Sequence, residues 1–166
     1  MPLQIESMSS PESLDVITSF LRTCASGVLV TSDKSANPYG ATVYFQFHDD
    51  LTITFATKTE TQKYKNMNEN DQVAFVVYNE EEQVEVQITG HVMPVEDPSQ
   101  RLQVINNMYI VSPKFSMSTQ PPAEKLIAGD YVAMRLVPTV IKMAVYARPD
   151  SEGDDDLYET LLLSES

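Results

Sequence analysis

The chain has 166 residues, of which 42% are hydrophobic, so it suits one globular domain with a substantial core. Its formal net charge of −13 argues against a nucleic-acid partner, because such binding needs a basic face, and no apolar run reaches the roughly 20 residues of a membrane span. The only cysteine, Cys24, excludes an intrachain disulfide; with no visible secretory signal, this predicts a cytoplasmic protein.

The first predicted elements are an arm, a helix and a series of strands. After an arm at residues 1–8, a helix runs from Ser9 or Ser10 to about Thr23, because Ser9-x-x-Glu12 fits a capping box and an apolar stripe follows. Strands are predicted at 27–31, 41–48, 51–56, 72–78 and 84–93, with turn residues at 32–40 and a hairpin between the second and third strands. Gly90 in the last of these strands indicates a β-bulge or a close approach of two backbones.

A helix, two strands and an acidic tail are predicted for the second half. Asp97-Pro98-Ser99-Gln100 starts the helix, residues 112–122 are predicted as a loop, and a helical turn follows at 122–128. The last two strands lie at 130–137 and 140–147, with Pro138 between them as a bend or an edge. The tail resembles a disordered acidic segment, except for an apolar cluster that would dock on the body or on a partner subunit: Leu157, Tyr158, Leu161, Leu162 and Leu163.

Strands therefore come in runs rather than alternating with helices. This order predicts an α+β, mainly β protein, built as an antiparallel barrel or sandwich with flanking helices. Three parts are expected: the arm at 1–8, the folded domain at 9–147 and the acidic tail at 148–166.

Several common catalytic and binding motifs are absent from the sequence. No glycine-rich dinucleotide or P-loop motif and no G-x-S-x-G elbow occurs, and neither His48 nor His91 has other ligands at metal-site spacing, so no metal site is predicted. Catalysis by side chains alone therefore has little support, whereas a bound organic cofactor would remove that difficulty.

The segment 51–78 has the most informative cluster of polar residues. Three of the eleven Lys and Arg residues, Lys58, Lys63 and Lys65, lie in its central connection beside three threonines. Hydroxyls, ammonium groups and free N–H groups at a helix start are what a phosphate needs. The alternative interpretation is a solvated, turn-rich crossover with ordinary surface lysines.

Residues 12–146 together resemble the flavin-binding split-barrel family, also called the pyridoxamine 5'-phosphate oxidase-like family. The shared features are a strand, a Pro-containing turn and an aromatic strand (GVLVTSDKSANPYGATVYFQFH); a T-x-x-x-[ST]-x-K-x-x-N segment from Thr57; an N-x-x-V segment; and a later strand with Gly before an apolar-Pro-Val step (GHVMPV). This resemblance implies a six-stranded antiparallel Greek-key split barrel that forms a homodimer, with FMN in a groove between the subunits.

The resemblance also implies which residues would bind FMN. Ala41, Thr42, Val43 and Tyr44 would run along the isoalloxazine ring, largely through backbone groups. Ala56 and Thr57 would flank the ribityl chain and phosphate, and Thr61, Gln62 and Lys63 would hold the phosphate, with Lys58 as a compensating charge. Family members with tight FMN binding often carry Arg at the positions of Ala41 and Gln62, both uncharged here.

Two functions follow from these expectations, and no residue stands out as catalytic in either. The first is an FMN-dependent oxidoreductase that passes electrons to an unidentified small molecule. The second is a binding or sensing module that holds a flavin, deazaflavin or haem without turnover; deazaflavin would prefer a more basic groove, and haem an axial His. A true pyridoxamine-phosphate oxidase is not expected, because its C-terminal substrate segment contains Trp and Arg, whereas this chain has no Trp and an acidic tail.

Overall fold

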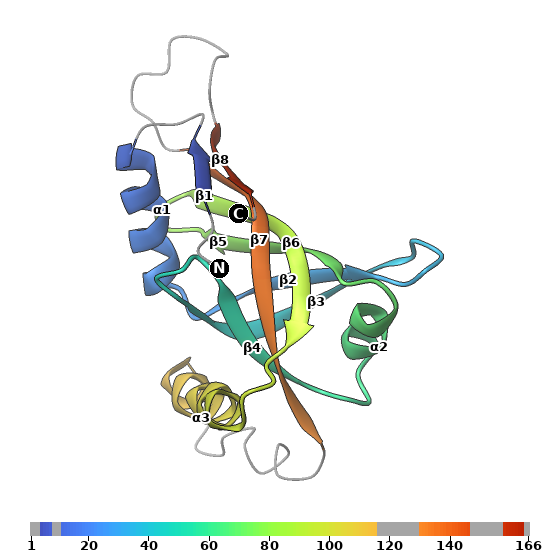
Figure 1. Ribbon diagram of the computed structural model, residues 1–166. Coiled ribbons are helices and arrows are strands. Elements are labelled where there is room, and N and C mark those ends of the chain that lie inside the picture. Colours follow the sequence, from blue (N-terminus) through green and yellow to red (C-terminus); the bar gives the residue numbers. More distant parts are fainter. Residues whose placement is uncertain (1–3, 8–10, 116–129, 147–157, 165–166) are drawn as a thin grey trace.

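A closed antiparallel β-barrel of six strands forms the centre of the protein (Figure 1), in a computed structural model that describes residues 4–7, 11–115, 130–146 and 158–164. The strands are β1 (Gln4–Ser7), β2 (Ser26–Ser32), β3 (Pro38–Phe47), β4 (Ile53–Lys58), β5 (Gln72–Asn79), β6 (Val84–Pro94), β7 (Tyr131–Val145) and β8 (Tyr158–Ser164). The helices are α1 (Pro11–Thr23), α2 (Gln62–Glu69) and α3 (Pro98–Phe115).

The order of strands around the barrel is β7-β4-β3-β2-β5-β6, and pairing of β6 with β7 closes it. Strand β8 adds to the C-terminal half of β7, and β1 adds to β8. In Figure 1 the three helices lie around the barrel at separate places, with α2 on the side opposite α1. This architecture confirms the predicted mainly β fold, a six-stranded antiparallel barrel with flanking helices.

Inward-facing apolar side chains fill the barrel. Burial alternates along β2 and β6 with a period of two residues, as expected where one face of a strand meets a core. Phe45 and Phe75 contact edge to face, with ring centroids 5.1 Å apart, and α1 contributes Ile17 and Leu21. Burying each such side chain contributes roughly 1.5–3 kcal/mol, so this core dominates the stability of the fold.

Two strand boundaries near the hairpin differ from the prediction. Strand β3 begins at Pro38, inside the segment predicted as a turn, and β4 begins at Ile53 rather than at Leu51. Leu51 has a φ of 66° and its N–H donates to the carbonyl of His48 at 3.0 Å. This turn takes Leu51 out of the extended conformation, so its apolar side chain is buried without belonging to the strand.

The two predicted strands at 130–137 and 140–147 are one strand, β7, which runs through Pro138. Gly90 pairs with Pro138 and Thr89 pairs with Val140, so β7 carries one extra residue at this point, the bulge predicted from Gly90. A Cβ at position 90 would lie 2.1 Å from the carbonyl oxygen of Val137, and only glycine allows that approach.

Further differences concern the ends of elements. Helix α3 continues to Phe115, four residues into the predicted loop at 112–122, and the predicted helical turn at 122–128 lies outside the described residues. Gln4–Ser7 and Tyr158–Ser164 form β1 and β8, although the sequence predicted strands in neither the arm nor the tail. None of the helices in the described ranges is long and apolar enough to cross a membrane.

Candidate functional site

The connection between β4 and α2 brings hydroxyl and main-chain N–H groups to one corner. Thr61 is the N-cap of α2: its hydroxyl accepts from the N–H three residues on at 3.4 Å and donates to the carbonyl of Lys58 at 2.7 Å. The hydroxyl of Thr57 lies 3.1 Å from that of Thr61. The N–H groups of Gln62 and Lys63 have no acceptor among the described residues, as is normal at a helix start.

Lys63 lies in the first turn of α2 and is half-buried. Within the described part of the chain, no carboxylate approaches its amino group within 4.0 Å. Burial lowers the pKa of Lys63 from its ordinary value. A cation partly withdrawn from water without a counter-charge is unfavourable by itself, so an anion bound at this corner would stabilise it.

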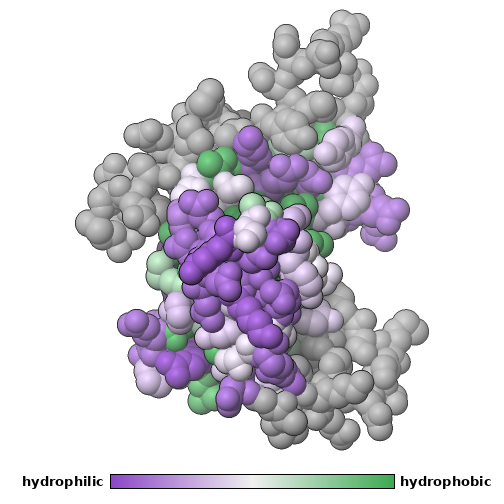
Figure 2. Space-filling model, turned by 90° about the vertical axis from the view of Figure 1, so that its right-hand side faces the viewer, coloured by the Kyte–Doolittle hydropathy of each residue, from purple (hydrophilic) through white to green (hydrophobic). Residues whose placement is uncertain are grey.

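The other two lysines of the predicted cluster have different surroundings. The amino group of Lys58 lies 3.8 Å from a carboxylate oxygen of Glu60 and 5.5 Å from the centre of the Tyr131 ring. Lys65 is exposed to solvent. Figure 2 views the molecule from the side that carries α2 and shows hydrophilic residues over most of the centre of this face. The three lysines are therefore not equivalent, and Lys63 has the surroundings best suited to an anion.

Strands β3 and β4 separate beside this corner. Their pairing covers three residues of each strand and ends where Phe45 faces Phe55, after which β4 pairs with β7 alone. The N–H of Phe45 donates to the carbonyl of Ala25, on the β2 side. Because successive residues of an antiparallel strand direct their main-chain groups to opposite sides, Thr42 and Tyr44 direct theirs to the opened edge of β3. No described strand pairs with this edge.

The side chains of the predicted ring-binding residues point in two directions. Val43 is buried in the core and Ala41 lies on the same face of β3, so these two face the barrel interior. Thr42 is exposed and Tyr44 is half-buried, both on the outer face. Of the four residues, Thr42 and Tyr44 therefore present main-chain groups to the opened edge, whereas the main-chain groups of Ala41 and Val43 face β2, with which both residues pair.

Other predicted residues lie along β4 and at the start of α2. Ala56 and Thr57 are buried, and Ala56 packs with Val104 on the side covered by α3. The side chain of Gln62 is exposed but donates to the Asn66 side chain at 2.8 Å, so it is directed along the helix.

Asn66 is a structural residue of the site that the sequence analysis did not identify. It is 2% exposed, and its side chain donates to the hydroxyl of Thr31 on β2 at 3.1 Å. Asn70 makes a similar bond to Ser32 at 2.9 Å. These bonds hold α2 against β2 and so position Lys63. The T-x-x-x-[ST]-x-K-x-x-N pattern, which ends at Asn66, was the signal available.

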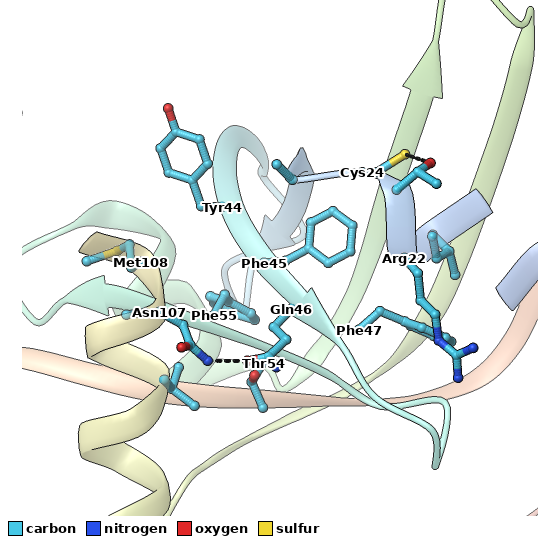
Figure 3. A pocket seen from close by; sticks show the side chains of 15 residues that line it. Arg22, Cys24, Tyr44, Phe45, Gln46, Phe47, Thr54, Phe55, Asn107 and Met108 are labelled. Atoms are coloured by element: carbon cyan, nitrogen blue, oxygen red, sulfur yellow. Dashed lines mark hydrogen bonds between the residues drawn. The ribbon is translucent and has the colours of Figure 1, made fainter. Parts of the chain in front are cut away.

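A cavity of about 450 Å³ lies next to the opened edge (Figure 3). It is bounded by the C-terminal end of α1, by β3 and β4, and by α3. Of the ten predicted site residues, Tyr44 and Ala56 line it. Its other walls combine apolar side chains with polar ones, the latter being Arg22, Thr23, Gln46, Thr54 and Asn107.

Neither histidine has the surroundings of a metal ligand. His48 Nε2 lies 2.8 Å from the hydroxyl of Thr54, and burial lowers the pKa of His48. His91 Nδ1 lies 3.3 Å from a carboxylate oxygen of Asp71. Over the described ranges, no group of three or more His, Cys, Asp or Glu residues is placed to hold a metal ion.

Similar folds occur in several solved structures. General stress protein 26 from Bacillus anthracis str. Sterne superposes with a TM-score of 0.58 at 20% identity, covering 78% of this chain and 92% of that chain. PhzG from Burkholderia lata 383, solved in complex with tetrahydrophenazine-1-carboxylic acid, has a TM-score of 0.62 at 17% identity, with 95% and 98% covered. A heme binding protein from Mycobacterium smegmatis has a TM-score of 0.65 at 10% identity, with 93% and 60% covered. At such identities the likeness shows the fold alone.

Comparison with protein families gives the more specific result. A search of curated proteins found no match. The family model described as pyridoxamine 5'-phosphate oxidase, in contrast, matches residues 14–142, which span the barrel from α1 to β7. The chain therefore belongs to the pyridoxamine 5'-phosphate oxidase-like family of split barrels.

Proposed function

We propose that the protein is an FMN-binding oxidoreductase that holds the phosphate of FMN at the corner between β4 and α2. The observation that carries the proposal is Lys63, a half-buried cation with no carboxylate near it in the described residues. Beside it are the N–H groups that begin α2 and the paired hydroxyls of Thr57 and Thr61. A phosphate monoester is a dianion that accepts several hydrogen bonds, so these residues fit it.

The opened edge of β3 suits the ring of the flavin. Thr42 and Tyr44 direct main-chain donors and acceptors to this edge, which can bond the polar rim of an isoalloxazine without any charged side chain. Ala56 follows Phe55, where β3 and β4 part, on the way to the corner between β4 and α2, so the ribityl chain would run past it. Bound FMN would supply the electron-transfer chemistry, while the protein binds and orients it.

A homodimer is part of the same proposal. Val28 on β2 is 41% exposed and Tyr78 on β5 is 54% exposed, both on the outer face of the barrel. Val28 pairs with Val76, and Val30 with Ala74, so apolar side chains run across both strands. Such a strip suits burial against a second copy of the chain. FMN would then lie in a groove between the two subunits.

One structural relative is a heme binding protein, but FMN fits the site in this chain better than haem does. Haem needs an axial ligand, and among the described residues no histidine lines the cavity beside the opened edge. His48 is held by Thr54 and His91 lies beside Asp71. The corner between β4 and α2, formed by Thr57, Thr61 and Lys63 and called the phosphate corner, has in contrast a direct use in binding the phosphate of FMN.

Replacing Lys63 by alanine tests the proposal. The purified protein should take up FMN and turn yellow, and Lys63→Ala should weaken FMN binding by roughly 1.5–3 kcal/mol, the range for a hydrogen bond to a charged group. The matched control is Lys65→Ala, which removes an exposed lysine from the same helix and should leave the affinity nearly unchanged. Titration of flavin fluorescence gives both dissociation constants. Equal affinity in the two variants would remove Lys63 from the site and contradict the proposal.

A further inference from the structure

A pair of carboxamide side chains faces the cavity beside the opened edge of β3. We propose that this cavity binds a flat, uncharged aromatic molecule that carries a carboxamide, and that Gln46 and Asn107 select the carboxamide. The role of such a molecule as a reaction partner of the flavin rests on the proposed function. Its binding in the cavity does not.

The argument begins with the hydrogen bond between the two side chains. Asn107 Nδ2 on α3 donates to Gln46 Oε1 on β3, and the bond is drawn in Figure 3. Each carboxamide has both a donor and an acceptor group. A bonded pair, whichever way its amides are turned, therefore leaves one NH₂ group and one carbonyl without a partner. Neither side chain has another partner among the described residues. A ligand carboxamide offers the matching carbonyl and N–H.

The walls on either side of this pair are suited to a flat ring. Figure 3 shows Tyr44 and Met108 on one side of the amide pair and Cys24 and Arg22 on the other. Leu21, Phe47 and Val104 add further apolar surface. The volume of about 450 Å³ lies within the range of small-molecule sites, roughly 300–1,000 Å³. Apolar side chains combined with a few placed polar groups are typical of such sites.

The charges near the cavity favour a neutral ligand over an anion. Arg22 is the basic residue of the lining, and its guanidinium lies 2.5 Å from a carboxylate oxygen of Asp49. This exposed ion pair places a carboxylate directly beside the cation, so a ligand carboxylate at Arg22 would meet the charge of Asp49. The hydroxyl of Thr54, also in the lining, is held by His48. The amide pair is therefore the recognition element that remains available.

The cavity also borders the proposed flavin site. Tyr44 and Ala56 line the cavity and belong to the segments expected to follow the flavin ring and the ribityl chain. A molecule bound against Gln46 would lie beside the next outward-facing residue of β3, Tyr44. This placement would put a substrate next to the ring that exchanges electrons with it.

Cys24 provides a readout that needs neither flavin nor activity. It is the only cysteine of the chain, lines the cavity and is half-buried. Burial raises the pKa of its thiol, so its alkylation by iodoacetamide is followed at a fixed alkaline pH by mass spectrometry. The probes are 2-naphthamide, 2-acetylnaphthalene, which keeps the carbonyl and loses the N–H groups, and 2-naphthoate, which carries a charge.

We expect 2-naphthamide to slow alkylation of Cys24 in a saturable way and to bind about tenfold more tightly than either other probe, as the loss of one hydrogen bond implies. Gln46→Leu and Asn107→Leu should each abolish this difference. Asn106→Leu, at an exposed position of the same helix that does not line the cavity, should keep it. Asn107 lies on the helix outside the barrel, so its variant keeps the test decisive if Gln46→Leu disturbs β3.

The proposal is overturned if 2-naphthamide does not protect Cys24 at saturating concentration, or if 2-acetylnaphthalene or 2-naphthoate binds as tightly. It is also overturned if Asn106→Leu loses the preference together with Asn107→Leu. The measurements are made without FMN, and they are repeated in Lys63→Ala so that binding of 2-naphthamide is measured separately from binding of FMN. A protein that binds 2-naphthamide selectively but does not bind FMN would contradict the proposed function and support this inference. A protein that binds FMN but not 2-naphthamide would support the proposed function and contradict this inference.

Discussion

Replacing Asn66 by alanine should loosen α2 from the barrel. The Asn66 side chain is 2% exposed, accepts from Gln62 at 2.8 Å and donates to Thr31 at 3.1 Å. The bond to exposed Gln62 competes with water and adds little, whereas Thr31 is 1% exposed and would lose its donor. Losing a bond at a buried hydroxyl costs about 1–3 kcal/mol, and the better helix propensity of alanine returns about 0.5 kcal/mol. The expected net loss is therefore about 0.5–2.5 kcal/mol.

The control for this variant is Asn68→Ala, which makes the same replacement at an exposed position of the same helix. It should be neutral or slightly stabilising, because only the propensity changes. Urea unfolding of both variants gives the midpoints, with similar slopes if unfolding is two-state. Asn66→Ala should also weaken FMN binding, because Lys63 is positioned by the same helix. Equal midpoints for the two variants would refute the idea that Asn66 anchors α2.

Two further predictions concern charge and assembly. Lys63→Met should raise the melting temperature of the flavin-free protein, whereas Lys65→Met, at an exposed position, should not. Burial lowers the pKa of Lys63, so at neutral pH the folded state carries the free-energy cost of a partly buried charge. This cost is lost as the pH rises towards the ordinary lysine pKa of 10.5, where Lys63 becomes neutral. The gain in melting temperature from Lys63→Met should therefore shrink as the pH rises. A melting temperature unchanged or lowered at pH 7 would contradict this account. Val28→Lys, on the apolar outer strip, should shift the protein from dimer to monomer in sedimentation experiments, whereas Leu102→Lys, at an exposed apolar position of α3, should leave it dimeric. A Val28→Lys protein that stays dimeric would remove this strip from the interface.

The strands of the barrel could be predicted because their patterns are local. Strand β6 alternates apolar and polar residues, and Gly90 indicated its bulge. The boundaries were less predictable because they depend on particular backbone conformations. Leu51 is apolar and buried like a strand residue, but its positive φ places it in a turn. Pro138 suggested a break in β7, yet the bulge opposite Gly90 accommodates it within one continuous strand.

The candidate site was predictable only where its residues are close in sequence. Thr57, Thr61 and Lys63 lie on one short connection, so their motif indicated the phosphate corner, although their role in binding remains a prediction. The cavity could not be predicted, because Gln46 and Asn107 are 61 residues apart and meet only when α3 covers β4. Asn66 ends the motif that begins at Thr57, but the motif does not indicate that this residue is buried; its hydrogen bond to Thr31 on β2 does.

The geometry of the phosphate corner explains how a chain of net charge −13 could bind an anion with few bases. Ala41 and Gln62, where relatives with tight FMN binding often carry Arg, are uncharged, and the Gln62 side chain is directed to Asn66. The attraction would then come from Lys63 and from the N–H groups at the start of α2, which carry a fixed partial positive charge. Both would lie close to a bound anion, and Lys63 is partly shielded from water, so salt would screen its attraction less than that of an exposed lysine. The binding of FMN should therefore depend on the placement of α2 more than on the number of basic residues, which makes the buried bond from Asn66 to Thr31 part of the recognition site.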